Sequence, residues 1–248
     1  MVPVSRILST IVTLLAENPT IQPGTATAGV TLADQVLDAV QKAIVNGELA
    51  PGSKLNEPEL ARQYGISRGP LREAIRRLEA RQLVRLRPHT GARVTRLSVD
   101  QLLDIYYLRE ALEGMACRLA AERVSVAEVD DLKRLLEAHG STVSETEGRA
   151  YFQQEGDLDF HYRLAMASGS QMIQRVLCVD LYHLMRMYRY QSSLFPDRPQ
   201  AALKEHWRII DAIAEGDGEL AELLMRRHIR AVRERVRDMH VDDVAADS

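Results

Sequence analysis

The segment from Leu60 to Leu83 constrains the fold most, because it combines two helical patterns with a tight turn between them. Gly65 permits the turn, Ser67 stands where it can cap the second helix, and Pro70 fits the first turn of that helix, where no backbone donor is needed. The second helix has one apolar stripe at three- and four-residue spacing, formed by Leu71, Ala74, Ile75 and Leu78. Its basic residues lie mostly off that stripe, at Arg68, Arg72, Arg76, Arg77 and Arg81. The segment therefore predicts a helix-turn-helix whose second helix offers guanidinium groups to a polyanion.

The residues on either side extend this unit. Residues 83–87 and 92–96 alternate apolar and basic side chains around a turn-forming stretch at 88–91, which predicts a small β-hairpin, or wing. A first helix before this segment is marked by apolar residues at helical spacing, Leu32, Val36, Val40 and Ile44. Residues 30–96 are therefore predicted to form a winged helix-turn-helix domain.

Charge is divided unevenly along the chain. Residues 30–96 hold 12 Lys and Arg against 7 Asp and Glu, a net charge of +5, whereas the whole 248-residue chain carries −3. Since residues 1–29 are neutral, residues 97–248 carry −8. A basic head on an acidic body is typical of a protein whose head binds nucleic acid. The alternative, a basic solvated helix on an ordinary helical domain, leaves this asymmetry unexplained.

The chain resembles the DNA-binding domain of GntR-type bacterial transcription regulators over nearly all of residues 31–96, through the run NGELAPGSKLNEPELARQYGISRGPLREAIRRLEARQLV followed by PHTGARV. The resemblance implies that polar and Arg side chains at the helix start meet operator bases and phosphates, and that the wing tip lies next to the minor groove. The residues assigned to DNA binding are Ser67, Arg68, Gly69, Arg72, Arg76 and Gly91. Gly69 stands where the family usually has Thr, which removes one side-chain contact.

The rest of the chain predicts a second, all-helical domain at 97–240. A chain of 248 residues with 46% hydrophobic content is long enough for a second core. No strand pattern occurs after Leu97, and helical periods cover 98–123, 125–140, 147–168, 170–192, 199–215 and 217–239, separated at Gly140, Gly169, Pro196 and the run Gly216-Asp217-Gly218. Such lengths and short connections predict an antiparallel bundle of six or seven helices. The expected fold class is therefore mainly α, with an N-terminal winged helix-turn-helix.

Two terminal segments lie outside these domains. Residues 1–29 are predicted to form a mobile arm, with a helical turn or two that pack on a partner, and residues 241–248 an acidic tail. No segment is apolar enough to span a membrane, and polar residues interrupt the apolar N-terminal stretch, which argues against a secretory signal. Cys117 and Cys178 lie in apolar helical runs without Cys-x-x-Cys spacing. They are expected to be buried free thiols in a cytoplasmic protein.

Four polar residues of the helical region stand on faces that should be buried: Asp157, His161, His206 and His228. Asp157 and His161 are four residues apart, so we expect them to share one helix face. His206 and His228 each align with aliphatic residues of their own helices. A single inward-facing histidine is more often a satisfied core residue. Three imidazoles and a carboxylate from three helices form a set of metal ligands.

The helical region resembles the FCD effector domain of the FadR-like GntR subgroup over about 102–232, through the runs YYLREALEGMACRLAAERV, DLDFHYRLAMASGS and EHWRIIDAIAEGDGELAELLMRRHI. The resemblance implies that the aspartate and the three histidines bind a divalent metal, for which zinc or nickel is expected. It also implies that Arg109 faces a cavity, where its guanidinium suits bidentate capture of a carboxylate. The alternative for Arg109 is a snorkelling side chain paired with Glu113. The residues assigned to effector binding are Arg109, Glu113 and Arg186, with His183 and Tyr190 as weaker candidates.

Three functions follow from these patterns. The preferred one is a ligand-responsive, sequence-specific transcription regulator, expected to be a repressor and not an enzyme. As a homodimer it would read a palindromic operator on double-stranded DNA and bind a small organic or sugar acid. A metal-dependent enzyme is the second, because open metal positions could activate water, but it leaves the winged helix unexplained and has no obvious general base. A nucleoid-type architectural protein is the third, and it needs neither the acidic bundle nor the polar interior.

Overall fold

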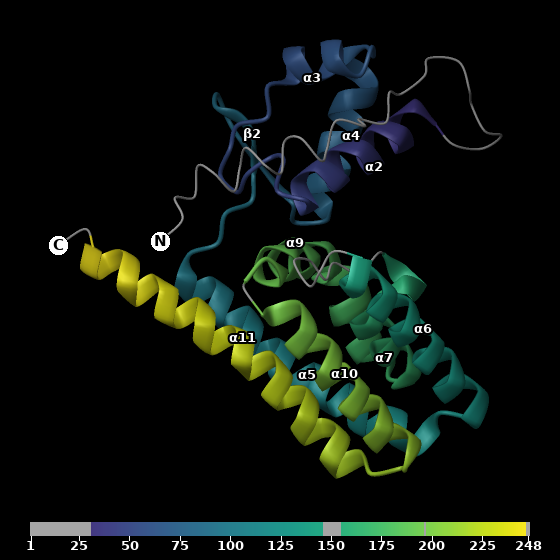
Figure 1. Ribbon diagram of the computed structural model, residues 1–248. Coiled ribbons are helices and arrows are strands. Elements are labelled where there is room, and N and C mark those ends of the chain that lie inside the picture. The colour runs from purple at the N-terminus through teal and green to yellow at the C-terminus, as the bar shows by residue number, and fades with distance from the viewer. Residues whose placement is uncertain (1–30, 146–154, 196, 247–248) are drawn as a thin grey trace.

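The computed structural model describes residues 31–145, 155–195 and 197–246 (Figure 1). The predicted arm at 1–29, the start of the helix predicted at 147–168 and the break expected at Pro196 lie outside these residues. In chain order the elements are α2 (Leu32–Val45), α3 (Glu57–Gln63), α4 (Arg68–Ala80), β1 (Val84–Arg87), β2 (Gly91–Val94), α5 (Val99–Arg123), α6 (Val126–Glu145), the 3₁₀ turn η1 (Gly156–Leu158), α7 (Phe160–Ala167), α8 (Gln171–Arg175), the π-helical segment η2 (Val176–Asp180), α9 (Tyr182–Ser193), α10 (Arg198–Ala214) and α11 (Gly218–Ala246).

The first unit, α2 to β2, is a winged helix-turn-helix, as predicted. Helix α2 packs on α4, and the apolar stripes of both helices meet in one core, which includes Val36, Val40, Leu71, Ile75 and Leu78. Strands β1 and β2 form an antiparallel hairpin in which Val84 lies opposite Val94. Gly47 follows α2 with a φ of 77°, a left-handed conformation that glycine adopts without steric cost. Strand β1 packs against α4, so the hairpin stands beside this helix as a wing.

The second unit is a bundle of seven helices, α5 to α11, which confirms the predicted architecture. The long helix α11 runs along α5, and α10 packs against α11 and α6 (Figure 1). Their shared core includes Tyr106, Leu136, Phe160, Ile209 and Met225. No helix of the described residues combines the length and the apolar character that a membrane crossing requires.

The helix boundaries differ from the prediction at three places. Helix α6 continues through Gly140, because this glycine keeps a helical backbone and its missing Cβ would meet only ordinary contacts. The single helix predicted at 170–192 is divided into α8, η2 and α9, since π-helical hydrogen bonding shifts the chain by one residue. Helix α11 continues beyond residue 239 to Ala246, because neither Gly nor Pro interrupts that stretch.

Helix α9 lies between the two units (Figure 1). Leu184, Met187 and Tyr188 on one of its faces belong to the same apolar core as α2 and α4. The hydroxyl of Tyr188 accepts a hydrogen bond of 2.8 Å from the backbone N–H of Leu97, in the connection between the wing and α5. The DNA-binding unit is therefore packed directly on α9 of the bundle.

Candidate DNA-binding surface and candidate effector site

The four arginines of helix α4 and its C-cap residue Arg81 divide between two tasks. Arg68, Arg72 and Arg76 are exposed. Arg77 donates to Asp34 of α2 at 2.6 Å, and Arg81 hydrogen-bonds to Gln41 of the same helix. The first three guanidinium groups remain directed outward, where they can meet phosphates or base edges.

The start of α4 forms a groove with the wing tip and with the segment before α3. It is lined by Lys54, Asn56, Glu57, Arg68, Arg72, His89, Thr90 and Gly91, among others. Glu57 lies 3.3 Å from Nε of Arg72 and orients that side chain. Ser67 occupies the N-cap position as expected, but its side chain makes no capping hydrogen bond. His89 and Thr90 are neighbours of Gly91 in the wing tip, which the resemblance had indicated, whereas the sequence did not indicate Lys54 or Asn56, because they reach this groove only through the fold.

No other atom lies within 4 Å of the position that a Cβ of Gly69 would take. The glycine is therefore not required by packing. A larger residue would extend from an exposed position of α4 and not into the core.

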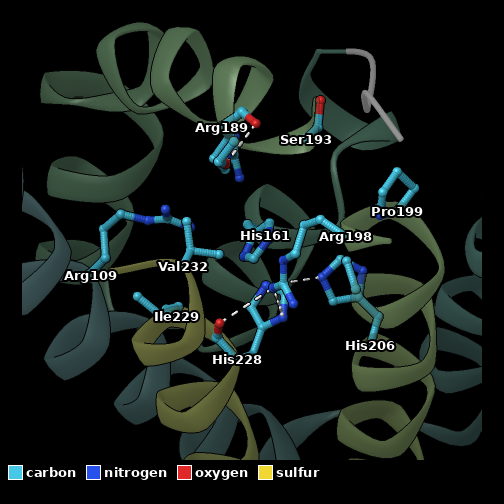
Figure 2. Close-up of a pocket in the computed structure, with 12 residues that line it drawn as sticks. Arg109, His161, Arg189, Ser193, Arg198, Pro199, His206, His228, Ile229 and Val232 are labelled. Atoms are coloured by element: carbon cyan, nitrogen blue, oxygen red, sulfur yellow. Dashed lines mark hydrogen bonds between the residues drawn. The ribbon is translucent and has the colours of Figure 1, made fainter. Parts of the chain in front are cut away.

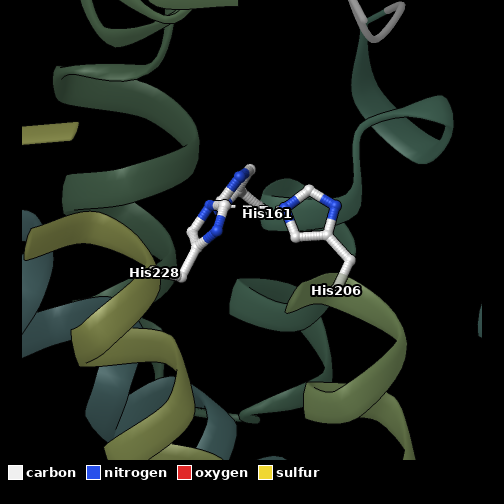
Figure 3. A group of neighbouring side chains, drawn as sticks. All are labelled: His161, His206 and His228. Carbon is white, nitrogen blue, oxygen red and sulfur yellow. Dashed lines mark hydrogen bonds between the residues drawn. The ribbon is translucent and has the colours of Figure 1, made fainter. Parts of the chain in front are cut away.

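Three histidines from three helices meet in the interior of the bundle (Figure 3). They are His161 of α7, His206 of α10 and His228 of α11, all buried, and one ring nitrogen of each lies within 4.8 Å of those of the other two. Nε2 of His206 lies 3.3 Å from Nε2 of His228. The ring of Phe160 stacks on His206 with centroids 4.1 Å apart and holds it in place.

Carboxylates orient two of these histidines. Nδ1 of His161 lies 2.6 Å from Oε2 of Glu113, and Nδ1 of His228 lies 2.6 Å from Oε2 of Glu205. An ionised carboxylate only accepts hydrogen bonds, so Nδ1 of His161 carries the proton and its Nε2 keeps its lone pair. Nδ1 of His228 lies between the carboxylate of Glu205 and Nη2 of Arg198, which is 3.0 Å away and can only donate, so Glu205 alone does not set the tautomer of this ring. A carboxylate behind the ring is the usual second partner of a metal-binding histidine. The donor set therefore fits a divalent cation.

The protonation states favour such a cation as well. Burial lowers the pKa of His161 and holds that of His206 well below its ordinary value. Burial also lowers the pKa of His228 to about 3, although Glu205 opposes the shift. Burial would raise the pKa of Glu113, but the charges and hydrogen bonds of Arg109 and His161 together outweigh it, and the pKa lies well below its ordinary value. Neutral imidazoles beside ionised carboxylates bind a cation without first losing a proton.

The expected position of Asp157 is wrong. This residue lies in η1 and is exposed, because α7 begins only at Phe160, so Asp157 and His161 share no helix face. The buried carboxylate of this segment is Asp159, which is 1% exposed and accepts a hydrogen bond of 3.0 Å from the backbone N–H of His161. An aspartate directly before an apolar helix is a typical N-cap signal, and it could have indicated this role.

A cavity of about 60 Å³ adjoins the histidines (Figure 2). One water needs about 10–15 Å³ of such volume, so the cavity holds roughly four waters or a small molecule. Three arginines line it, Arg109, Arg189 and Arg198. Each has a carboxylate partner, in the pairs Arg109–Glu113 at 2.7 Å, Arg189–Asp159 at 2.5 Å and Arg198–Glu205 at 2.8 Å. The wall of the cavity is therefore rich in guanidinium groups and balanced in charge.

The structure separates the expected effector residues. Arg109 lines the cavity and is only 5% exposed, so it does not snorkel to solvent, although its pairing with Glu113 is present. Arg186 lies outside this cavity, where it donates to Glu155 at 2.6 Å, beside α2. The sequence did not single out Arg189 or Arg198, because nothing in the spacing of their helices distinguishes them from surface arginines.

The two cysteines are free thiols, as expected. Cys117 is buried, whereas Cys178 in η2 is only half-buried. Burial raises the pKa of Cys178 to about 12 and that of Cys117 well above its ordinary value, so neither thiol has the character of a nucleophile.

A winged helix with outward arginines, joined to a helical bundle with a polar internal cavity, defines a DNA-binding regulator with a second, helical domain. Comparison with known families agrees. Residues 32–94 match the model described as bacterial regulatory proteins, gntR family, and residues 104–231, more than half of the chain, match the FCD domain. The chain belongs to the GntR family of transcription regulators, in the group that carries an FCD domain.

Several curated relatives are similar over most of their length. The probable D-xylose utilization operon transcriptional repressor of Paenarthrobacter nicotinovorans is 33% identical over 201 residues, which cover 81% of this chain and 87% of that protein. The HTH-type transcriptional repressor RspR of Escherichia coli (strain K12) is 26% identical over 209 residues, covering 84% and 90%. These relatives are regulators, in agreement with the place of this chain in a family of transcription regulators.

Solved structures show the same fold. E. coli McbR/YncC superposes with a TM-score of 0.65 at 20% identity, covering 85% of this chain and 99% of that one. A putative GntR transcriptional regulator from Rhodococcus sp. RHA1 gives a TM-score of 0.64 at 21% identity, with 82% and 96% covered.

Proposed function

We propose that this regulator is a ligand-responsive repressor that binds a palindromic operator as a homodimer. The observation that carries the proposal is the groove between the start of α4 and the wing tip, with Arg68 and Arg72 in its wall. Guanidinium groups at the start of a recognition helix suit bidentate contacts to guanine or to phosphate. The curated relatives that are named repressors support the direction of the regulation.

Operator binding tests this proposal. Arg72→Ala should weaken binding to a fragment of the protein's own promoter by about 1–3 kcal/mol, because the guanidinium contact is lost while the apolar stripe of α4 stays intact. A gel-shift titration at fixed salt measures the effect. Arg134→Ala is the matched control, since Arg134 is also an exposed arginine but lies on α6.

Equal binding by the parent and Arg72→Ala would show that α4 is not the recognition helix. Binding to random duplex as tight as to the promoter would favour an architectural protein instead.

We also propose that His161, His206 and His228 hold a divalent ion, with zinc or nickel the best candidates for nitrogen donors. The convergence of the ring nitrogens and the carboxylates behind two of the rings support this. Three protein ligands leave coordination positions open. When bound, the ion would tie α7, α10 and α11 together and supply positive charge to the cavity for an anionic ligand.

Metal analysis tests this second proposal. The purified protein should carry close to one divalent ion per chain, and His206→Ala should lose it, because one of three ligands is removed. Chelation should lower the Tm of the parent but leave that of His206→Ala unchanged. His89→Ala, on the exposed wing, is the control that keeps the ion. Elemental analysis that finds no metal after reloading would reduce the three histidines to a polar core network.

We propose a small organic or sugar acid as the effector. The charge balance of the cavity supports this, because the three arginine–carboxylate pairs leave no net charge until a cation is added. A cavity that gains a buried double positive charge is stabilised by an anion of matching charge. Glu113 links Arg109, which lines the cavity, to His161.

A further inference from the structure

Helix α9 contacts both functional parts of the molecule. On one side Arg189, Ser192 and Ser193 line the cavity beside the histidines (Figure 2). On another side Leu184 and Met187, together with Tyr188, complete the core of the DNA-binding domain. A single helix of 12 residues thus connects the cavity to the DNA-binding domain.

Arg189 is the residue of α9 that holds this helix to the histidine cluster. Its Nη1 donates to Oδ1 of Asp159 at 3.2 Å and its Nη2 to Oδ2 at 2.5 Å. Oδ1 of Asp159 also caps α7, the helix that carries His161, by accepting from the backbone N–H of His161. The position of α9 is therefore set against the first turn of α7.

The guanidinium of Arg189 is a charged group that can exchange partners. Burial by itself lowers its pKa, but the carboxylates of Asp159 and Glu113 outweigh that effect and raise it. Because Arg189 lines the cavity, an anion there would compete with Asp159 for the same Nη atoms. Bidentate guanidinium–carboxylate pairs have a fixed planar geometry, so a new partner changes where the arginine's helix lies.

We propose that Arg189 is the positioning residue that couples the cavity to the DNA-binding domain: an anion in the cavity draws Arg189 from Asp159, and α9 carries the change to the DNA-binding domain. The identity of the ligand as an anion rests on the proposed function. The connection from Asp159 through Arg189 and α9 to the DNA-binding domain does not depend on it. Two contacts transmit the change. The Tyr188 hydroxyl holds the N–H of Leu97, and Glu155 accepts 2.6 Å hydrogen bonds from Gln41 of α2 and from Arg186 of α9.

Hydrogen–deuterium exchange on the full chain, without added ligand, tests the coupling. Asp159→Asn keeps an N-cap residue on α7 but removes the charge that holds Arg189, so it should imitate the anion. Amides in residues 83–97 should then exchange about fivefold faster, the factor expected for the loss of one ordinary hydrogen bond. Arg189→Lys should act in the same direction, because an ammonium cannot make both contacts.

Arg230→Gln is the matched control. It removes a 2.7 Å ion pair with Glu110, which joins α11 to α5 away from α9, and it should leave exchange at 83–97 as in the parent. If the Arg189–Asp159 pair served only stability, Asp159→Asn, Arg189→Lys and Arg230→Gln would all lower Tm. Amide exchange at residues 83–97 would then stay as in the parent in all three variants.

Tyr188→Phe tests the other end of the helix. It removes the hydroxyl that Leu97 donates to, and it should speed exchange at 83–97 while exchange in α7 stays as in the parent. The proposal is overturned if Asp159→Asn and Arg189→Lys change amide exchange only in α7 and around the cavity. Because no effector or operator is added and every variant is compared with the parent at the same metal content, that outcome is distinguishable from a failure of the proposed function.

Discussion

Arg109 illustrates how a single residue acquires its role from a neighbour four positions away. Its Nε donates to Glu113 at 2.7 Å, and Glu113 in turn holds His161. Both side chains are about 5% exposed, so removal of one would leave the other charged and buried without its partner. The pair therefore orients a histidine and presents a guanidinium to the cavity at the same time.

Arg109→Lys is the substitution that tests this role, because it keeps the positive charge beside Glu113 but removes the fork. We expect the affinity for an acid effector to fall about tenfold or more, as a charge-assisted bidentate contact is lost. Operator titrations with and without lactate, malate, citrate and gluconate measure the response as a ratio of Kd values. An acid that binds the protein tightly but shifts no operator titration would contradict a sensing role for the cavity.

Helix caps show which elements depend on a single polar side chain. Ser98 caps α5 in a reciprocal arrangement with Gln101, in which each side chain accepts from the other residue's backbone N–H. Ser67 occupies the same position before α4 but makes no side-chain cap. The two serines therefore form a natural comparison.

Ser98→Ala should lower the free energy of unfolding by about 1 kcal/mol, the usual value of such a cap. Ser67→Ala should change stability by much less, because no capping bond is lost, and should reduce operator affinity instead. Chemical denaturation and gel shift on both variants check this. Equal destabilisation by the two substitutions would show that the cap of α5 is not a stabilising feature.

The accuracy of the sequence prediction differs between elements for a physical reason. Helix α4 and the wing follow from local patterns, since periodicity and turn chemistry are set by neighbouring residues. The division of 170–192 into α8, η2 and α9 depends on contacts with other helices, which no local pattern reports. The error at Asp157 arose in the same way, because a turn of 3₁₀ helix shifted the start of α7 to Phe160.

The site shows the same limit. Inward-facing histidines were visible as polar residues on apolar faces, and the structure brings all three together. Arg189 and Arg198 were not visible in this way, because only the packing of α9 on α10, and of α10 on α11, places them at one cavity.

At the scale of the whole molecule, several large apolar side chains remain exposed on adjoining elements of the bundle. They are Leu108 and Met115 on α5, Met172 on α8 and Val179 on η2, with Met172 69% and Val179 66% exposed. Helix α5 packs against both α8 and η2, so these side chains lie on neighbouring surfaces. An apolar surface of this kind suits a second copy of the chain, which the proposed palindromic operator would require.

Met115→Glu should therefore convert the proposed dimer to a monomer, because a charge at a symmetric interface is buried twice. Sedimentation velocity gives the mass, and a gel shift should show a matching loss of affinity. Leu223→Glu, an exposed leucine of α11, is the control. A parent protein that sediments as a monomer at micromolar concentration would contradict the assignment.

Linkage sets a further condition on the whole molecule. An effector that weakens operator binding must itself bind more weakly to the DNA-bound protein by the same factor, typically about 5–150-fold. The factor depends on the difference in affinity between two arrangements of the dimer and not on affinity alone.

The position of α9 also bears on how the molecule unfolds. Leu184, Met187 and Tyr188 fill part of the core that α2 and α4 share, although they lie about ninety residues beyond the wing in the chain. A fragment cut at the boundary near residue 97 would lose those side chains and expose the surface that they cover. The boundary that separates two functions in the sequence is therefore not a boundary between two independent folding units, and heating should melt both parts in one cooperative transition.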